Sequence, residues 1–195
     1  MALGRQAKII STQQQAAVLN FLKSTRSPLR NKVIFLLSLK AGLRAKEIAN
    51  ITWAMVTTSD GQVSDKIALV DKASKGRSGG HVWLNKDLRA ALIELHQQSP
   101  NVEANQFVIT TERQRGTSSQ CIVNMFSYWY GQLGFTGCSS HSGRRTFITN
   151  AAKRISSVGG SMRDVQMLAR HSSLNMTMLY IEADVEAMRK VVQLV

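Results

Sequence analysis

Residues 27–48 read SPLRNKVIFLLSLKAGLRAKEI, and this stretch decides the class of fold. Ser27 followed by Pro28 is typical of a helix start, because serine caps helices well and proline suits the first helical position. The apolar residues 33–39 continue that helix, and the run is far too short to span a membrane. Gly42 is well placed to end the helix, since glycine readily adopts the left-handed conformation of a C-terminal cap.

Outward from this helix, the pattern predicts a mainly α domain with one small antiparallel β-sheet, an α+β fold. Two β-rich runs between Ile67 and Leu84 flank the polar, glycine-rich segment KASKGRSGG, which predicts a β-hairpin, and residues 106–110 predict a further brief strand. Capping residues and apolar periodicity predict the other helices. These begin at or after Thr12, Ala45, Asn85, Ser118 or Ser119, Ser140 and Ser161, and two more short helices hold Tyr180 and residues 184–195. No linker divides the chain, so we expect one domain over residues 1–195, with an extended arm at 1–11.

The charge balance is strongly basic. Lysine and arginine number 25 against 12 aspartates and glutamates, which gives a formal net charge of +13. Such a chain is typical of a protein that meets a polyanion, and nucleic acid is the commonest one. The basic residues recur along the whole chain, as expected if a folded face carries them. Charge alone leaves open a generally basic, highly soluble protein.

Other classes of protein find little support in the sequence. The N-terminus lacks the long apolar core of a secretory signal. The two cysteines, Cys121 and Cys138, are too few for a disulfide framework and lack metal-ligand spacing. A reducing, cytosolic setting is the simplest interpretation.

Two places in the first half carry residues suited to phosphate chemistry. Arg44 and Glu47 lie three residues apart in a tight helical connection. On their own they predict an ion pair between neighbours on a helix surface, which contributes little to stability. Lys75 lies at the tip of the predicted hairpin and on its own is a solvated lysine.

Two further places lie in the second half. His141 and Arg144 are three residues apart, so on a helix they share one face and can reach one anion together, whereas Arg145 points elsewhere. Cations at a helix start oppose the helix macrodipole, and such local violations are more common at functional sites. His171 and Tyr180 lie nine residues apart, and each alone is an ordinary polar or core residue.

As a set, two arginines, a lysine, two histidines and a tyrosine match the needs of attack on a phosphodiester. Each arginine offers a planar fork that fits two phosphate oxygens and keeps its charge. A tyrosine has an unperturbed pKa of about 10, so a tyrosine nucleophile needs nearby positive charge or a base. A lysine on a hairpin can give the departing alkoxide its proton. No acidic triad or metal-ligand cluster competes for the role, so the sequence implies no cofactor and no divalent metal.

In this order and spacing the chain resembles the tyrosine recombinase (phage integrase) family. The matching motifs are AGLRAKEI with Arg44, the hairpin lysine Lys75, HSGRRTFIT with His141 and Arg144, and LARHSSLNMTMLY with His171 and Tyr180. The match covers roughly residues 28–182 and implies the catalytic-domain fold of that family. It also implies a site-specific recombinase or integrase that cuts and rejoins DNA.

The resemblance implies a role for each matched residue. Tyr180 attacks the scissile phosphate and forms a 3′-phosphotyrosyl link, while Arg44 and Arg144 hold the non-bridging oxygens. Lys75 protonates the leaving 5′-oxygen. A different hairpin register would give that role to Lys72.

The remaining matched residues support these steps. His141 assists proton transfer, His171 hydrogen-bonds the phosphate, and Glu47 matches an acidic position that supports the site. Candidates for further DNA contacts are Lys46, Arg77, Arg145 and Arg170.

Three positions depart from the family's usual pattern. Arg170 stands where a glycine usually precedes the second histidine, and Gly143 stands where leucine usually lies between His141 and Arg144. Arg145 occupies a position that is often histidine. None of these departures removes a catalytic group, and Arg170 lies where it can alter DNA contacts or the packing of its turn.

The resemblance also implies partners and a setting. Double-stranded DNA is the expected partner, with four protomers on two duplexes, in a cytoplasmic protein of bacterial, phage or mobile-element origin that needs no membrane. Typical members carry an N-terminal DNA-binding domain, which we expect to be absent because only 27 residues precede the first shared helix. The tail 184–195 suits docking onto a neighbouring subunit and equally suits its own core. A type IB topoisomerase-like enzyme and a non-catalytic DNA-binding relative stay open as alternatives.

Overall fold

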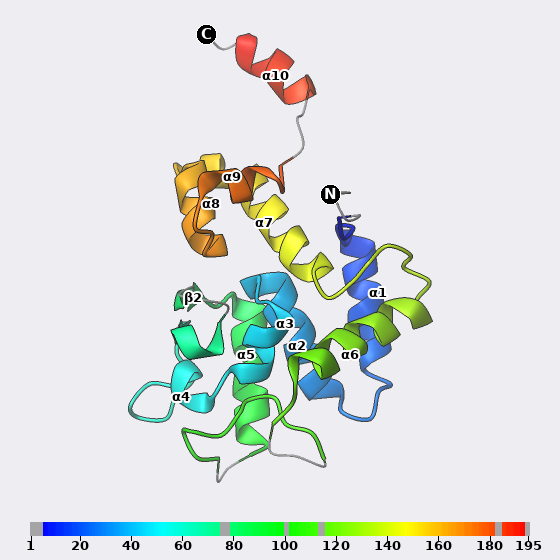
Figure 1. Ribbon diagram of the computed structural model, residues 1–195, viewed down its shortest axis with the longest axis vertical. Helices are drawn as coiled ribbons and strands as arrows, with labels where there is room; N and C mark the ends of the chain where they lie inside the picture. The colour runs from blue at the N-terminus through cyan, green and yellow to red at the C-terminus, as the bar shows by residue number, and fades with distance from the viewer. Residues whose placement is uncertain (1–5, 75–78, 100–101, 113–115, 182–184, 194–195) are drawn as a thin grey trace.

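The computed structural model describes residues 6–74, 79–99, 102–112, 116–181 and 185–193, so Lys75 and Arg77 lie outside the described residues. A mainly helical body carries a two-stranded antiparallel sheet, as the sequence predicts (Figure 1). The elements in chain order are α1 (Thr12–Leu22), α2 (Pro28–Ala41), α3 (Ala45–Asn50), α4 (Trp53–Val56), β1 (Lys66–Leu69), η1 (Asp71–Ala73), β2 (Gly80–Trp83), α5 (Lys86–Gln97), α6 (Ser119–Gln132), α7 (Ser142–Arg154), η2 (Ile155–Val158), α8 (Met162–Ala169), α9 (Leu174–Met178) and α10 (Val185–Val192).

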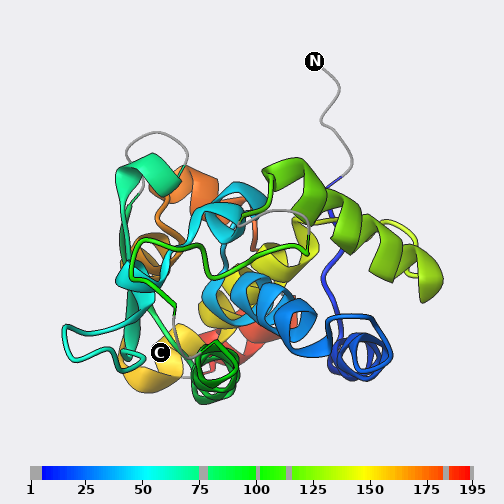
Figure 2. The same cartoon turned by 90° about the horizontal axis from the view of Figure 1, so that it is seen from below.

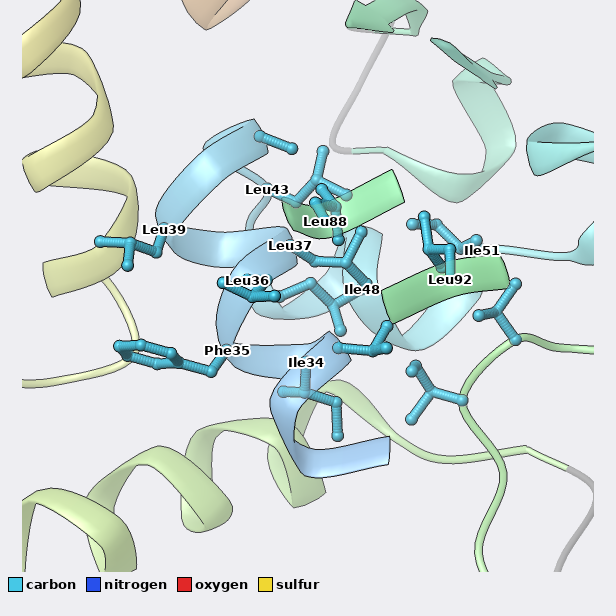
Figure 3. Close-up of a cluster of buried hydrophobic side chains, with 14 of the residues drawn as sticks. Ile34, Phe35, Leu36, Leu37, Leu39, Leu43, Ile48, Ile51, Leu88 and Leu92 are labelled. Atoms are coloured by element: carbon cyan, nitrogen blue, oxygen red, sulfur yellow. The ribbon is translucent and has the colours of Figure 1, made fainter. Parts of the chain in front are cut away.

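Helix α2 lies in the middle of the body and is buried on almost every side (Figures 1 and 2). It packs against α1, α3, α5 and α7, and its residues 33–37 are at most 2% exposed. Figure 3 shows Leu37 of α2 beside Ile48 of α3 and Leu88 of α5. A helix that is apolar all round must be covered all round, so α2 determines where its neighbours lie. Its predicted limits, Pro28 at the start and Gly42 at the cap, are confirmed.

Gly42 is the point where the chain turns from α2 into α3. Its φ of 64° lies in the left-handed region, which glycine adopts without strain. A Cβ atom at this position would lie 2.5 Å from Cδ1 of Phe147 on α7, so the missing side chain also lets α7 approach closely. The N–H of Leu43 donates to the carbonyl of Leu37 at 3.0 Å. This tight turn places Arg44 directly at the start of α3.

The segment before α1 packs onto the body without forming a helix or strand over residues 6–11. Ile10 is 1% exposed, and its N–H donates to Oγ1 of Thr146 at 2.9 Å. The predicted cap of α1 was wrong by one residue. Ser11 caps the helix, because its Oγ accepts from the N–H of Gln14 at 3.2 Å while its own N–H donates to the Gln14 side chain at 3.0 Å. Thr12 is the first helical residue.

The predicted hairpin is confirmed, with Ile67 of β1 opposite Val82 of β2 in the antiparallel pair. The predicted strand at 106–110 is wrong, because only one isolated bridge forms there, between Thr52 and Phe107. The short helix α4, which the sequence did not predict, begins at Trp53 and turns the chain away after that single pairing.

The C-terminal third adds a second, smaller apolar cluster built on Ile148, Val165 and Ala169. Two predictions need correction here. His141 is the N-cap of α7 in place of Ser140, and Tyr180 lies just beyond the end of α9 instead of within a helix. The final helix α10 stands apart from the rest of the body (Figure 1). Among the described helices, none is both long and apolar enough to cross a membrane.

Candidate active site

Arg44 and Glu47 form a tight unit at the start of α3. Glu47 is completely buried, and its two carboxylate oxygens receive different donors from Arg44. The backbone N–H of Arg44 donates to Oε2 at 2.8 Å, and Nη1 of its guanidinium donates to Oε1 at 2.9 Å. The Arg44 side chain is 23% exposed, so the buried carboxylate orients the guanidinium while part of the guanidinium stays accessible to solvent. The pair is therefore more than the surface ion pair that the spacing alone predicts.

A second arginine reaches the same carboxylate from the far end of the chain. Nη2 of Arg170 donates to Oε2 of Glu47 at 2.7 Å, and the Arg170 side chain is only 5% exposed. Burial raises the pKa of the Glu47 carboxyl, but the charge of Arg170, the backbone N–H of Arg44 and the charge of Arg44 outweigh it. The pKa of Glu47 is therefore below its ordinary value, and the carboxylate is ionised at neutral pH.

Arg144 lies in the first turn of α7 and is 3% exposed. Its fork joins the ends of two other helices, because Nη1 donates to the carbonyl of Gly42 and Nη2 to the carbonyl of Ala169, both at 2.5 Å. Helix C-termini carry partial negative charge, so both contacts favour the cation. Burial, followed by the charge of Arg44, lowers the pKa of Arg144 to about 10, and the guanidinium stays protonated at neutral pH.

Gly143, one of the departures from the family's pattern, has a steric reason. A Cβ atom on residue 143 would clash with Oγ of Ser38 and lie 2.9 Å from the Ser38 Cβ. The first turn of α7 thus lies directly against α2, and a leucine does not fit in this chain. This close contact fixes the depth at which Arg144 enters the site.

His141 lies at the N-cap of α7, exposed and one turn before Arg144. Partial desolvation, then the charges of Arg144 and Arg44, lower the pKa of His141 below its ordinary value. The imidazole is therefore neutral at pH 7, which lets it accept a proton.

His171 and Tyr180 meet ring to ring after α8. Their ring centroids are 5.3 Å apart with an interplanar angle of 28°, a stacked arrangement. The backbone of Tyr180 is held at both polar groups, since its N–H donates to the carbonyl of Thr177 at 3.0 Å and its carbonyl accepts from Oγ1 of Thr149 at 3.0 Å. Burial, followed by the charges of three arginines, lowers the pKa of His171 to about 4. His171 is therefore a neutral imidazole.

Thr177 is a residue that the sequence analysis missed. It is fully buried, and its Oγ1 lies 2.9 Å from Nδ1 of His171. A neutral imidazole has one donor and one acceptor nitrogen, and a hydrogen bond to one fixes the role of the other. When the Thr177 hydroxyl donates to Nδ1, the ring proton lies on Nε2, which is then a hydrogen-bond donor. No sequence pattern short of the fold indicates this contact.

Most of the residues singled out from the sequence lie in one place. Arg144 is within electrostatic reach of Arg44, Glu47, Arg170 and Tyr180, and His141 is within reach of both Arg44 and Arg144. The remaining candidates have other surroundings or lie outside the described residues. Nζ of Lys46 donates to the carbonyl of Ser74 at 2.9 Å, Lys72 is exposed in η1, and Arg145 bonds to the side chain of Gln6. Lys75 and Arg77 lie outside the described residues.

A helical body with one small hairpin thus brings two arginines, two histidines and a tyrosine to one site. The model of the phage integrase family matches residues 8–187, and the chain belongs to that family. The curated relatives include two proteins called tyrosine recombinase XerA. The one from Thermococcus kodakarensis is 26% identical over 94% of this chain and 61% of its own length. The one from Pyrococcus horikoshii is 25% identical over 87% of this chain and 56% of its own length.

Solved structures share the fold. A crystal structure of XerA recombinase matches 99% of this chain and 65% of its own with a TM-score of 0.74 at 17% identity. The Tn1549 transposon integrase in complex with a circular intermediate DNA matches 97% of this chain and 66% of its own with a TM-score of 0.75 at 14% identity. This chain thus spans about three fifths of the length of the two curated relatives.

Proposed function

We propose that this chain is the catalytic domain of a site-specific DNA recombinase that cuts and rejoins strands through a 3′-phosphotyrosyl intermediate. The observation that carries the proposal is the stacking of Tyr180 on a neutral His171, within electrostatic reach of Arg144 and so of the Arg44 pair. Three segments distant in sequence, around residues 44–47, 141–144 and 170–180, converge there. A packing role for Tyr180 alone gives no reason for buried arginines around it, since buried charge is costly without a partner.

In the proposed reaction, Oη of Tyr180 attacks the scissile phosphorus. The bond between phosphorus and the 5′-oxygen breaks as the bond from Oη to phosphorus forms. The phenolic proton passes to a base, and the neutral, exposed imidazole of His141 suits that role. Lys75 supplies the proton that the 5′-oxygen takes up, a role that rests on the family resemblance because Lys75 lies outside the described residues.

The positive groups act on charge that develops during this step. Arg44, whose side chain is 23% exposed, holds one non-bridging oxygen, and Nε2 of His171 donates a further hydrogen bond. The role of Arg144 on the other non-bridging oxygen rests on the family resemblance, because both its Nη atoms donate to the carbonyls of Gly42 and Ala169. These donors are fixed in advance by Glu47, by two helix ends and by Thr177, so little reorganisation accompanies the reaction. The protein–DNA bond keeps the energy of the cleaved linkage, and a 5′-hydroxyl of a second DNA end reverses the step.

Double-stranded DNA and further copies of the chain are the proposed partners. Related structures include XerH recombinase bound to difH substrate and a lambda integrase dimer bound to a core site. Met188, Val191 and Val192 of α10 are 54%, 56% and 65% exposed, which suits docking of this helix onto a neighbouring subunit in a tetramer on DNA. We place this single catalytic domain in the cytoplasm of a bacterium, or in a phage or mobile element that acts there.

The test is covalent capture on a nicked suicide substrate, in which the cleaved end diffuses away and the protein–DNA adduct accumulates. The wild-type chain should give a band shifted by the attached DNA. Tyr180→Phe should give none while it still binds DNA. Tyr128→Phe is the matched control, because Tyr128 is 58% exposed on α6 and its ring lies beside Phe21 of α1. An adduct formed by the Tyr180→Phe protein shows that another residue is the nucleophile.

A further inference from the structure

Arg170 combines three features that each cost stability. It is the only non-glycine residue with positive φ among the described residues, with φ of 51° and ψ of 47°. Its side chain is 5% exposed, so a full charge is withdrawn from water. Its Nε and Nη1 are buried without a hydrogen-bond partner in the described part of the chain. Residues that cost stability in several ways at once are more common at functional sites, so we expect a function of Arg170 in its contacts.

The contact that Arg170 makes is with Glu47, 123 residues away in the chain. Oε2 of Glu47 accepts from Nη2 of Arg170 at 2.7 Å and from the backbone N–H of Arg44 at 2.8 Å, while Oε1 accepts from Nη1 of Arg44 at 2.9 Å. One buried carboxylate therefore bridges two arginines. The bridge ties the start of α3 to the C-terminal cap of α8, directly before His171.

The burial of Arg170 argues against a contact with DNA. Its Nε and Nη1 are sealed within the protein, and its Nη2 is already engaged by Glu47. A groove or phosphate contact needs donors that the nucleic acid can reach, and Arg44, at 23% exposure, is the partner of Glu47 that offers them.

We propose that Arg170 is a positioning residue, which acts through Glu47 to hold the Arg44 guanidinium in place for the scissile phosphate and does not itself touch DNA. The inference rests on the function proposed above. The charge of Arg170 is the largest attraction that keeps Glu47 ionised against its burial, and without that charge the carboxylate holds Arg44 less firmly. The left-handed backbone at residue 170 is what aims the side chain back toward α3.

The test compares single-turnover cleavage with DNA affinity in six variants of the full chain, four of which are single changes at Arg170 or its control. Arg170→Gln removes the charge, Arg170→Lys keeps a charge without the planar fork, and Arg170→Gly removes the side chain while it suits the left-handed backbone. Arg163→Gln is the control, because Arg163 is exposed on the same helix. The glycine variant suits the left-handed backbone, and a cooperative melting transition should show that it folds.

We expect Arg170→Gly and Arg170→Gln to cleave about 10–100-fold more slowly than the wild type, with DNA affinity and its salt dependence unchanged. Arg170→Lys should recover part of the rate, and Arg163→Gln should match the wild type. Glu47→Gln should slow cleavage, and adding Arg170→Gln to it should slow cleavage no further, because the two residues act as one unit.

Two results overturn the inference. One is full cleavage by Arg170→Gly. The other is a parallel loss of affinity with a salt slope reduced by about one, the mark of a lost phosphate contact. Failure of the wild-type chain to form any adduct instead overturns the proposed function itself, and the inference with it.

Discussion

Replacing Thr177 by valine tests how His171 is set for its role. The change removes one hydroxyl and leaves the volume of the side chain almost unchanged. Oγ1 of Thr177 lies 2.9 Å from Nδ1 of His171, and the imidazole is neutral because its pKa is about 4. Without the hydroxyl, nothing assigns the single ring proton to Nε2. Part of the population then presents Nε2 as an acceptor, which repels a phosphate oxygen.

The size of the effect follows from the burial of the pair. Thr177 is 0% exposed and His171 is 7% exposed, so water cannot easily replace the hydroxyl as the hydrogen-bond partner of Nδ1. An unpartnered buried polar group costs about 1–3 kcal/mol, and the added methyl of valine offsets part of that cost. The free energy of unfolding should therefore fall by about 1 kcal/mol. Loss of a residue that orients a substrate-binding histidine lowers the rate about 10–100-fold, or about 1.4–2.7 kcal/mol of transition-state stabilisation.

The assay is single-turnover cleavage of the suicide substrate, with nitrogen NMR of the His171 ring as the second measurement. Thr177→Ser keeps the hydroxyl and serves as the control, with a rate near that of the wild type. The valine variant should cleave slowly and show a mixture of ring tautomers. Cleavage at the wild-type rate refutes the reasoning, and so does slow cleavage with the ring signals unchanged.

Three further predictions concern α7 and His171. Arg144→Ala should slow cleavage by about 10²–10³-fold in the adduct assay, because a preorganised donor to the phosphate is lost; a rate near wild type contradicts the clamp. Gly143→Ala should lower the unfolding free energy by about 1–3 kcal/mol in urea titration, since its Cβ meets Ser38, whereas Gly131→Ala, with open space around it, should not. Because the pKa of His171 is lower in the folded chain, the unfolded chain takes up the proton at a higher pH as the solution is acidified. The free energy of unfolding therefore has its full value above about pH 6.5 and falls toward pH 4. The loss is at most about 3 kcal/mol, and a His171→Asn variant should lack it in denaturation measured across that range.

Local signals in the sequence were enough for much of the helical framework. Pro28 and Gly42 mark the limits of α2 because each acts through its own backbone preferences. Asn85 and Ser161 cap their helices as predicted, for the same reason. The strand expected at 106–110 failed because pairing depends on a partner, and α4 removes that partner after one bridge.

The catalytic candidates could be selected from the sequence because arginine, histidine and tyrosine carry their chemistry wherever they lie. The residues that hold these candidates in place could not be selected in the same way. Thr177 contacts His171 only because the turn between α8 and α9 folds back on itself. The contact of Arg170 with Glu47 spans 123 residues, and no local pattern predicts it. The burial that defines the role of Arg170 is a property of the packed chain.

The two carbonyls that hold Arg144 have a consequence for synthesis of the protein. One belongs to Gly42, in the first quarter of the chain, and the other to Ala169, in the last. A chain emerging from the ribosome therefore has no completed clamp until its end has folded back onto its beginning. A truncated or partly unfolded copy should therefore lack a fixed Arg144 guanidinium. Arg144 thus takes up its final place only when the whole domain has folded.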